Sequence, residues 1–429
     1  MFGRRIAVVG TGYVGLTTGA CLASLGHHVV CADVDALKVA RLDVGQVDIL
    51  EPGLADLVLE GRKAGRLEFV VGAENAVGDA EVVFLCLPTP MGAGGAADLS
   101  AVESVAEAVR DQLPYGCVVV CKSTVPVGTS TRVAALLRRE DVAVVSNPEF
   151  LREGSAVRDF LHPDRIVVGS DSPQAAERVA ALFAKLGAPT VLMDAASAEM
   201  VKYAANCFLA MKLSYVNAVA ELCELVGADV TSVTEGMGHD RRIGQSFLQP
   251  GPGWGGSCLP KDTHAMVRIA ESVGVDLDLV RATIDTNHRQ QQRVVDKLRD
   301  AVGPLAGTRV AVYGLAFKAG TNDLRDSPAL AVAELLAFEG AELVAYDPEI
   351  SRPLVGMTVV DDPYEAARGA AAVVLLTEWP QFRTLDWARV AAAMSGSVVL
   401  DTRNHLDPDA LRRAGLALHG VGRRAIAKI

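Results

Sequence analysis

The stretch RIAVVGTGYVGLTTGACLASLGHHVVCAD, residues 5–33, decides the fold. A β-branched run over residues 5–9 leads into the pattern G-x-G-x-x-G at residues 10–15. An apolar run then ends at Gly26, and a second β-branched run ends at Asp33. This order predicts a strand, a tight turn, a helix and a second strand, with a carboxylate about 20 residues after the turn. It is typical of a dinucleotide-binding βαβ unit.

The glycines and the acid have separate expected roles. Gly10 and Gly12 let the backbone turn tightly and approach a pyrophosphate, and Gly15 lets the helix pack close to the strand. The helix N-terminus stabilises the phosphate charge. Asp33 is placed to accept hydrogen bonds from ribose hydroxyls and to repel a 2′-phosphate. NAD is therefore expected rather than NADP, and FAD is the main alternative.

Composition narrows the class of protein. The chain has 429 residues, is 50% hydrophobic and 22% charged, and carries a net charge of -11. This favours about two to four folded domains and argues against a partner that is nucleic acid or a membrane. The eight cysteines show neither C-x-x-C nor zinc-ligand spacing. We expect reduced thiols, no metal and a cytoplasmic location.

Three further runs are predicted strands, each followed by a polar or proline-containing segment. The runs are residues 81–87, 117–121 and 142–145, and the segments after them begin at Pro88, Lys122 and Asn147. Ligands of open α/β sheets bind beyond the carboxyl ends of the strands, so these ends should share one cleft with the glycine turn. A strand-terminating role explains Pro88, but explains Thr124, Glu149 and Glu153 together less well.

A long helix is predicted over residues 197–226, which contain neither Gly nor Pro and precede Gly227. Lys202 and Asn206 stand at i and i+4, so both side chains would lie on one face and could donate to one oxygen. A lysine in this setting is more often a surface residue whose stem lies along apolar neighbours.

Cys258 differs from the other seven cysteines. It lies in the stretch GPGWGGSCLPKD, residues 251–262, before a helix predicted over residues 264–273. Pro260 suits the first turn of that helix, and Lys261 is close in sequence. A helix N-terminus and a nearby cation both favour a thiolate. Cys258 is therefore the predicted nucleophile, and the others are expected to be packing residues.

An α/β pattern restarts after Gly303. Strands are predicted over residues 309–313, 342–346, 372–377 and 397–400, with a helix over residues 329–339. Lys318, Arg325 and Arg403 follow strand ends, where cations can contact a diphosphate. The predicted fold is α/β, with two Rossmann-like doubly wound domains joined by a long central helix. The expected domains are residues 1–195 for NAD, 196–300 as a central helical dimerisation domain, and 301–429 for a nucleotide.

The motifs together resemble the UDP-glucose/GDP-mannose dehydrogenase family over essentially the whole chain. They occupy residues 10–15, 122–129, 147–154, 199–206, 251–262 and 314–318. Gly-Gly-Ser-Cys-Leu-Pro-Lys-Asp, residues 255–262, is the most specific. The resemblance implies oxidation of the primary alcohol of a nucleotide sugar to a carboxylate, with two NAD+ per sugar. It also implies a UDP-binding C-terminal domain and a homodimer through the central helix.

In family terms, Cys258 adds to the aldehyde intermediate to give a thiohemiacetal, which is oxidised to a thioester and hydrolysed. Lys202 and Asn206 stabilise the oxyanion, and Lys202 assists removal of the alcohol proton. The resemblance implies that the catalytic residues are Cys258, Lys202, Asn206, Asp262, Glu149 and Thr124. Asp262 and Thr124 would handle a proton through a bound water, and Glu149 would place the hydrolytic water.

The binding residues follow from the glycine turn and the same resemblance. The expected cofactor residues are Gly10, Gly12, Tyr13, Val14, Gly15, Asp33, Lys38, Thr89, Thr124, Glu153, Lys261 and Arg325. The expected substrate residues are Glu149, Phe150, Leu151, Arg152, Lys202, Asn206, Arg242, Phe247, Leu248, Gln249, Pro250, Gly251, Gly255 and Lys318. Arg242 resembles an arginine contributed across the dimer.

Several alternatives stay open. Arg242-Ile243-Gly244 with Phe247-Leu248 favours UDP-glucose as substrate, whereas Leu259 is shared with enzymes of GDP-mannose. UDP-N-acetylmannosamine is a further candidate. A β-hydroxyacid dehydrogenase would need neither Cys258 nor the second sheet, and a short-chain dehydrogenase needs Tyr-x-x-x-Lys, which the sequence lacks. A non-catalytic NAD-binding regulator would not need the catalytic set.

Overall fold

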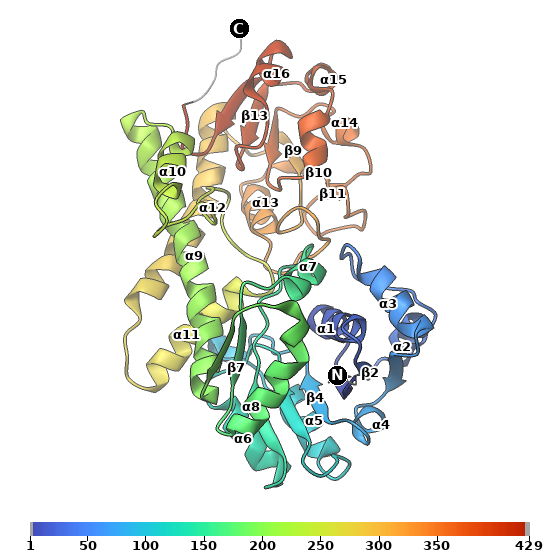
Figure 1. The fold of residues 1–429 in the computed structure, drawn as a ribbon. Coiled ribbons are helices and arrows are strands. Elements are labelled where there is room, and N and C mark those ends of the chain that lie inside the picture. The colour runs from blue at the N-terminus through green and yellow to red at the C-terminus, as the bar shows by residue number, and fades with distance from the viewer. Residues whose placement is uncertain (1–2, 425–429) are drawn as a thin grey trace. The chain divides into compact units, whose positions relative to one another are not determined.

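The computed structural model describes residues 3–424, so the outermost residues of the predicted first and third domains, 1–2 and 425–429, lie outside it (Figure 1). The chain forms two compact units. Unit 1 comprises Met1–Ala205 and His264–Gly274, and unit 2 comprises Asn206–Thr263 and Val275–Ile429. The division of the chain at residues 195 and 300 stays a prediction.

The sheet of unit 1 has the strand order β3-β2-β1-β4-β5-β6-β7-β8. Its strands are β1 Arg5–Val9, β2 His28–Asp33, β3 Leu67–Val71, β4 Val82–Leu85, β5 Val118–Cys121, β6 Ala143–Ser146, β7 Ile166–Gly169 and β8 Thr190–Met193. Neighbouring strands are parallel except β6 and β7. The ends of β1, β4, β5 and β6 therefore lie side by side on one edge, as the sequence predicted.

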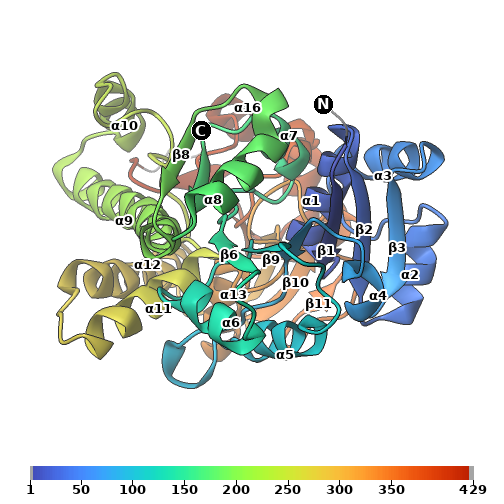
Figure 2. The ribbon, with the colours of Figure 1, turned by 60° about the horizontal axis from the view of Figure 1, so that its bottom comes forward.

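Helices cover both faces of this sheet (Figure 2). The elements are α1 Tyr13–Ser24, α2 Ala36–Asp43, α3 Leu54–Lys63, α4 Glu74–Val77, η1 Ala93–Gly95, α5 Ser100–Val109, α6 Thr129–Leu137, α7 Ala156–Leu161, α8 Pro173–Ala180 and η2 Ala181–Leu186. Because side chains alternate along a strand, Ile6 and Val8 of β1 join the core formed with α1, α3 and α8. Ala7 and Val9 join the core formed with α4, α5 and α6.

Unit 2 contains a second parallel sheet, of order β11-β10-β9-β12-β13-β14. Its strands are β9 Arg309–Tyr313, β10 Glu342–Tyr346, β11 Thr358–Val359, β12 Ala372–Leu375, β13 Val398–Asp401 and β14 Ala417–Gly420. Its helices are α12 Asp278–Val302, α13 Pro328–Phe338, α14 Pro363–Ala366, η3 Pro380–Thr384, α15 Trp387–Ala393 and α16 Pro408–Arg413. Val310 and Val312 face α12 and α13, whereas Ala311 and Tyr313 face the other core. The predicted fold class is confirmed.

The remaining helices are α9 Ala195–Val226, α10 Val230–Gly238 and α11 Leu259–Ser272. The boundary between the units falls within α9 and again within α11. The start predicted for α11, residue 264, is wrong by about a turn and a half: the Asp262 N–H donates to the Cys258 carbonyl at 3.0 Å. Pro260 is tolerated there because the first turn needs no N–H from it. Among the described residues, no helix is long and apolar enough to cross a membrane.

Candidate active site

The glycine turn of unit 1 has the geometry that phosphate binding requires. Gly10 has φ +94°, and a Cβ on it would lie 2.5 Å from the Cys86 carbonyl oxygen. A Cβ on Gly15 would lie 1.8 Å from the Gly10 oxygen, which only glycine avoids. A Cβ on Gly12 would meet no described atom within 4 Å, and no described side chain caps the start of α1. The bare backbone and the uncapped helix start suit a pyrophosphate.

Asp33, at the end of β2, has the ionisation that the ribose role requires. Its Oδ2 accepts from the Thr11 N–H at 3.0 Å and lies 3.3 Å from Lys38 Nζ. Burial alone would raise the pKa of Asp33, but hydrogen bonds from Thr11 and Asp35 and the charge of Lys38 lower it to about 2. Asp33 is thus a carboxylate at any ordinary pH, and these residues fit NAD.

The segment after β6 carries a buried ion pair. Lys202 Nζ of α9 donates to Glu149 Oε1 at 2.9 Å and to the Glu149 carbonyl at 2.7 Å. The two side chains are 4% and 5% exposed, and the Leu151 N–H donates to the other carboxylate oxygen at 2.6 Å. Burial by itself would raise the pKa of Glu149, but the Lys202 charge and these hydrogen bonds outweigh it and lower the pKa. Glu149 is therefore ionised.

Other predicted residues of unit 1 support this segment. Thr89 Oγ1 donates to the Thr124 carbonyl at 2.9 Å, which ties the ends of β4 and β5 together. The Phe150 ring centroid lies 3.5 Å from the Arg165 guanidinium and 5.3 Å from Lys202 Nζ. Arg152 forms an ion pair with Asp159 at 2.5 Å and is itself largely exposed. These contacts fix the start of the predicted substrate segment, residues 149–152, and leave the Arg152 side chain near solvent.

Tyr13, the first residue of α1, has a buried hydroxyl that makes no hydrogen bond with the described residues. Burial raises its pKa, and the carboxylates of Glu51 and Glu153 raise it further. The phenol is therefore neutral, and its hydroxyl is a hydrogen-bond donor in the neighbourhood of these two carboxylates. A ligand hydroxyl is one acceptor that would satisfy this donor.

Cys258, which lies in unit 2, differs from the other seven cysteines of the chain, as predicted. It is partly exposed, whereas the other seven are buried. Burial raises the pKa of Cys86, Cys121 and Cys207 to about 12, so these thiols stay protonated. The Cys258 carbonyl accepts the first hydrogen bond of α11, so the thiol is at the helix N-cap. Helix partial charge there favours a thiolate.

A second buried pair lies beside this helix start. Asn206 Nδ2 of α9 donates to Asp262 Oδ2 at 2.6 Å, and both residues are buried. Lys261 Nζ contacts the other oxygen, Asp262 Oδ1, at 2.5 Å. The cation expected next to the thiol is thus held by Asp262. In this structure Lys202 and Asn206 donate to two different carboxylates.

The glycine-rich segment of unit 2 is fixed by its own backbone groups. The Gly251 N–H donates to Asn217 Oδ1 at 2.9 Å, and Gln290 donates to the Gly251 carbonyl at 2.7 Å. A Cβ on Gly255 would lie 1.9 Å from the Asp326 carbonyl oxygen, so packing within unit 2 already requires glycine there. Phe247 has φ +61°, a strained value for an aromatic residue. Such strain is often found at binding sites.

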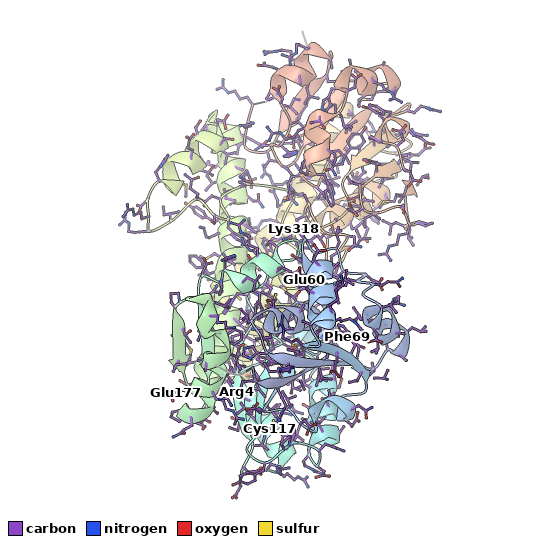
Figure 3. All side chains as sticks on the ribbon, turned by 45° about the vertical axis from the view of Figure 1, so that its right-hand side comes forward. Arg4, Glu60, Phe69, Cys117, Glu177 and Lys318 are labelled. Atoms are coloured by element: carbon purple, nitrogen blue, oxygen red, sulfur yellow. The ribbon has the colours of Figure 1, made fainter. Side chains whose placement is uncertain are left out.

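The remaining predicted residues are spread over exposed and buried positions. Arg242 is 89% exposed and paired with Asp240, and Arg325 forms a fork with Asp323. Lys318, labelled in Figure 3, follows β9 and its Nζ lies 5.5 Å from the Phe317 ring centroid. Val14, Lys38, Leu151, Glu153 and Lys261 are half-buried, Leu248 and Pro250 are buried, and Gln249 is exposed.

Sequence reasoning gave no role to two residues that hold the site together in unit 1. Glu51 Oε2 accepts from the Gly154 N–H at 2.8 Å and so fixes the segment after β6. Glu199 accepts from the N–H groups of Gly128 and Ser130 at 2.6 and 2.8 Å, which caps α6. Glu199 lies within a motif, so its one-turn spacing from Lys202 was a usable signal, but Glu51 offered none.

These features define a dinucleotide-dependent oxidoreductase with two Rossmann-like sheets and a partly exposed thiol. Three segments match the UDP-glucose/GDP-mannose dehydrogenase family: its NAD binding domain at residues 4–187, its central domain at 196–289 and its UDP binding domain at 311–408. A UDP-glucose 6-dehydrogenase of Bacillus subtilis (strain 168) is 42% identical, covering 99% of this chain and 94% of the relative. The chain belongs to this family.

Two solved structures are similar along the whole chain. A UDP-glucose dehydrogenase from the hyperthermophilic archaeon Pyrobaculum islandicum matches with a TM-score of 0.91 and 38% identity, over 98% of both chains. A UDP-D-ManNAc dehydrogenase from Pyrococcus horikoshii matches with a TM-score of 0.88 and 29% identity, over 98% of this chain and 99% of the other. The predicted family and enzyme class are confirmed.

Proposed function

We propose that this chain oxidises UDP-glucose to UDP-glucuronate, removing four electrons per sugar. The observation that carries the proposal is Cys258, the partly exposed thiol at the N-cap of α11. A single alcohol oxidation has no use for such a nucleophile, whereas oxidation through an aldehyde to a carboxylate does. The similar chains from Bacillus subtilis and Pyrobaculum islandicum, named for UDP-glucose, favour that sugar.

The chemistry balances as follows. The primary alcohol loses its proton and a hydride to give an aldehyde. The Cys258 thiolate forms a C–S bond to the aldehyde carbon, and protonation of the oxygen gives a thiohemiacetal. Loss of the hydroxyl proton and a second hydride gives a thioester. Water then adds to the thioester carbon and the C–S bond breaks, releasing the carboxylate, the thiolate and two protons. When bound, NAD+ supplies the hydride acceptor for both oxidations.

The polar side chains have roles that suit this sequence of steps. Lys202 in its neutral form takes the alcohol proton, and the resulting ammonium and Asn206 donate to the oxygen that becomes negative; such a donor contributes about 10²–10³ in rate. Glu149, ionised by its pairing with Lys202, places the hydrolytic water. Asp262, hydrogen-bonded to Asn206, and Thr124 handle a proton through a bound water.

A homodimer through α9 belongs to the same proposal. Phe208, Tyr215 and Leu222 recur every seven residues and are 57%, 56% and 58% exposed. Seven-residue spacing puts them on one face of the helix, as in paired helices. An exposed apolar stripe of this kind is typical of an interface between copies. The Arg242 side chain is 89% exposed, so it can contact a second copy of the chain.

The test is a panel of substrates with NAD+, followed by NADH formation. UDP-glucose is expected to give the highest kcat/KM, with UDP-N-acetylmannosamine and GDP-mannose far slower. UDP-N-acetylmannosamine is the second candidate because the similar Pyrococcus horikoshii chain is named for that sugar. Faster oxidation of either rival would overturn the choice of sugar, and no NADH from any of the three would overturn the proposed function.

A further inference from the structure

Lys122 is a buried lysine to which the proposed reaction gives no role. It follows β5 directly, and the whole residue is 6% exposed. Its Nζ donates to Asn147 Oδ1 at 3.0 Å, and Asn147 Nδ2 in turn donates to the Val167 carbonyl at 2.7 Å. The Phe183 ring centroid lies 5.8 Å from Nζ. Within the described residues, Asn147 is the one hydrogen-bond acceptor of this amine.

These surroundings make the charge of Lys122 depend on pH. An ammonium has three donors, and leaving buried donors unsatisfied is unfavourable. Burial, the largest cause, and the like charge of Lys202 lower the pKa of Lys122, Cys86 and Glu149 oppose the change, and together they bring it to about 8. Among the residues that the structure describes, these three are the titratable groups that act on it; η2 contributes the Phe183 ring, and a carbonyl of β7 holds Asn147. Lys122 therefore gains or loses its proton inside the protein near pH 8.

The position of Lys122 links that proton to Glu149 and Lys202. Asn147, which holds the amine, precedes Glu149 by two residues on the same segment after β6. Glu149 is in turn bound by Lys202 at 2.9 Å. A second positive charge at Lys122 stabilises the Glu149 carboxylate and disfavours a proton on Lys202, because like charges repel and opposite charges attract.

We propose that Lys122 is a positioning residue whose buried ammonium sets the ionisation of the Glu149–Lys202 pair. It does so without touching the sugar. A neutral Lys202 can accept the proton of the alcohol as the hydride leaves, and a charged Lys122 raises the fraction of neutral Lys202. The inference rests on the proposed function only where it gives Lys202 this proton.

The experiment compares kcat/KM for UDP-glucose from about pH 6 to about pH 10 in wild type, Lys122→Met and Lys122→Arg. Lys122→Met lacks the charge at every pH, Lys122→Arg keeps it at every pH, and wild type loses it near pH 8. Lys185→Met, which removes an exposed lysine of the same unit, controls for net charge.

Lys122→Met should lose about tenfold in kcat/KM at pH 7, because a neighbouring charge moves a pKa by about one. The deficit should shrink above pH 8, where wild type also lacks the charge, and the ratio of Lys122→Arg to Lys122→Met should show no step at pH 8. A ratio of wild type to Lys122→Met that is the same at every pH would overturn the proposal. It would leave Lys122 with a packing role.

A readout without turnover separates this inference from the proposed function. If wild type forms no NADH, the proposed function fails and unfolding decides the role of Lys122. Removing the charge at Lys122 raises the pKa of Glu149, so the acid loss of thermal stability should begin at a higher pH in Lys122→Met than in Lys185→Met. If the two variants lost thermal stability over the same range of low pH, the inference would be overturned.

Discussion

Glu149→Gln should strongly destabilise unit 1, because it leaves the Lys202 ammonium buried without its counter-charge. The two side chains are 4% and 5% exposed and 2.9 Å apart. Removing one partner of such a pair typically costs about 3–5 kcal/mol. In a unit of roughly 200 residues, each kcal/mol lowers Tm by about 2–4 °C. The expected loss is therefore about 6–20 °C.

The assay is thermal unfolding at pH 7 of wild type, Glu149→Gln, Lys202→Met and the double variant. The double variant has no unpaired charge in this pair, so its loss should be well below the sum of the single losses, with a coupling of about 2 kcal/mol or more. Asp48→Asn is the matched control, because it breaks an exposed pair with Arg41 at 2.9 Å and should leave Tm nearly unchanged.

The pH dependence of the pair has a definite sign. The pKa of Glu149 in the folded protein lies below its ordinary value of 4.5. The stabilisation is therefore fully present above about pH 4.5 and is lost as pH falls through the lower folded pKa. Glu149→Gln should remove this part of the loss of stability at low pH. A Glu149→Gln variant with the Tm of wild type, or strictly additive single losses, would refute the reasoning.

Two further predictions concern the cofactor and the interface. Asp33→Asn should weaken NAD binding about tenfold and bring NAD and NADP affinities closer, because the carboxylate with a pKa of about 2 is lost; calorimetric titration with both cofactors tests this, and an unchanged ratio of affinities speaks against it. Phe208→Glu with Leu222→Glu should turn a dimer into a monomer in sedimentation velocity, since both side chains lie on the exposed stripe. Phe338→Glu, at a 91% exposed residue of α13, should leave the mass unchanged, and a double variant that stays dimeric would exclude the stripe as the interface.

Features encoded locally were predictable from the sequence. The strand over residues 5–9 and the turn at Gly10 follow from hydrophobic pattern and glycine spacing, and the structure reproduces them. The separate setting of Cys258 was also predictable, because it follows from the residues beside it. The start of α11 was placed too late, although Pro260 signalled a first turn, because the cap itself is the hydrogen bond from the Asp262 N–H to the Cys258 carbonyl.

Long-range pairing was not predictable in the same way. Lys202 and Glu149 are 53 residues apart and Asn206 and Asp262 are 56 residues apart, so their contacts arise only when the strand ends and helices have assembled. Gly255 shows a second long-range contact that the sequence does not reveal. Its place in the substrate set stays a prediction, and the structure adds a packing reason for glycine there, because the Asp326 carbonyl already fills the place of a Cβ.

The most direct test of the central claim is the number of NADH molecules formed per UDP-glucose consumed, measured with wild type and with Cys258→Ser. The account predicts two NADH and a carboxylate product for wild type. It predicts loss of turnover for Cys258→Ser with NAD binding retained, because the thiolate at the N-cap of α11 carries the aldehyde to the thioester. One NADH per sugar with release of free aldehyde, or near-normal turnover in Cys258→Ser, would contradict it.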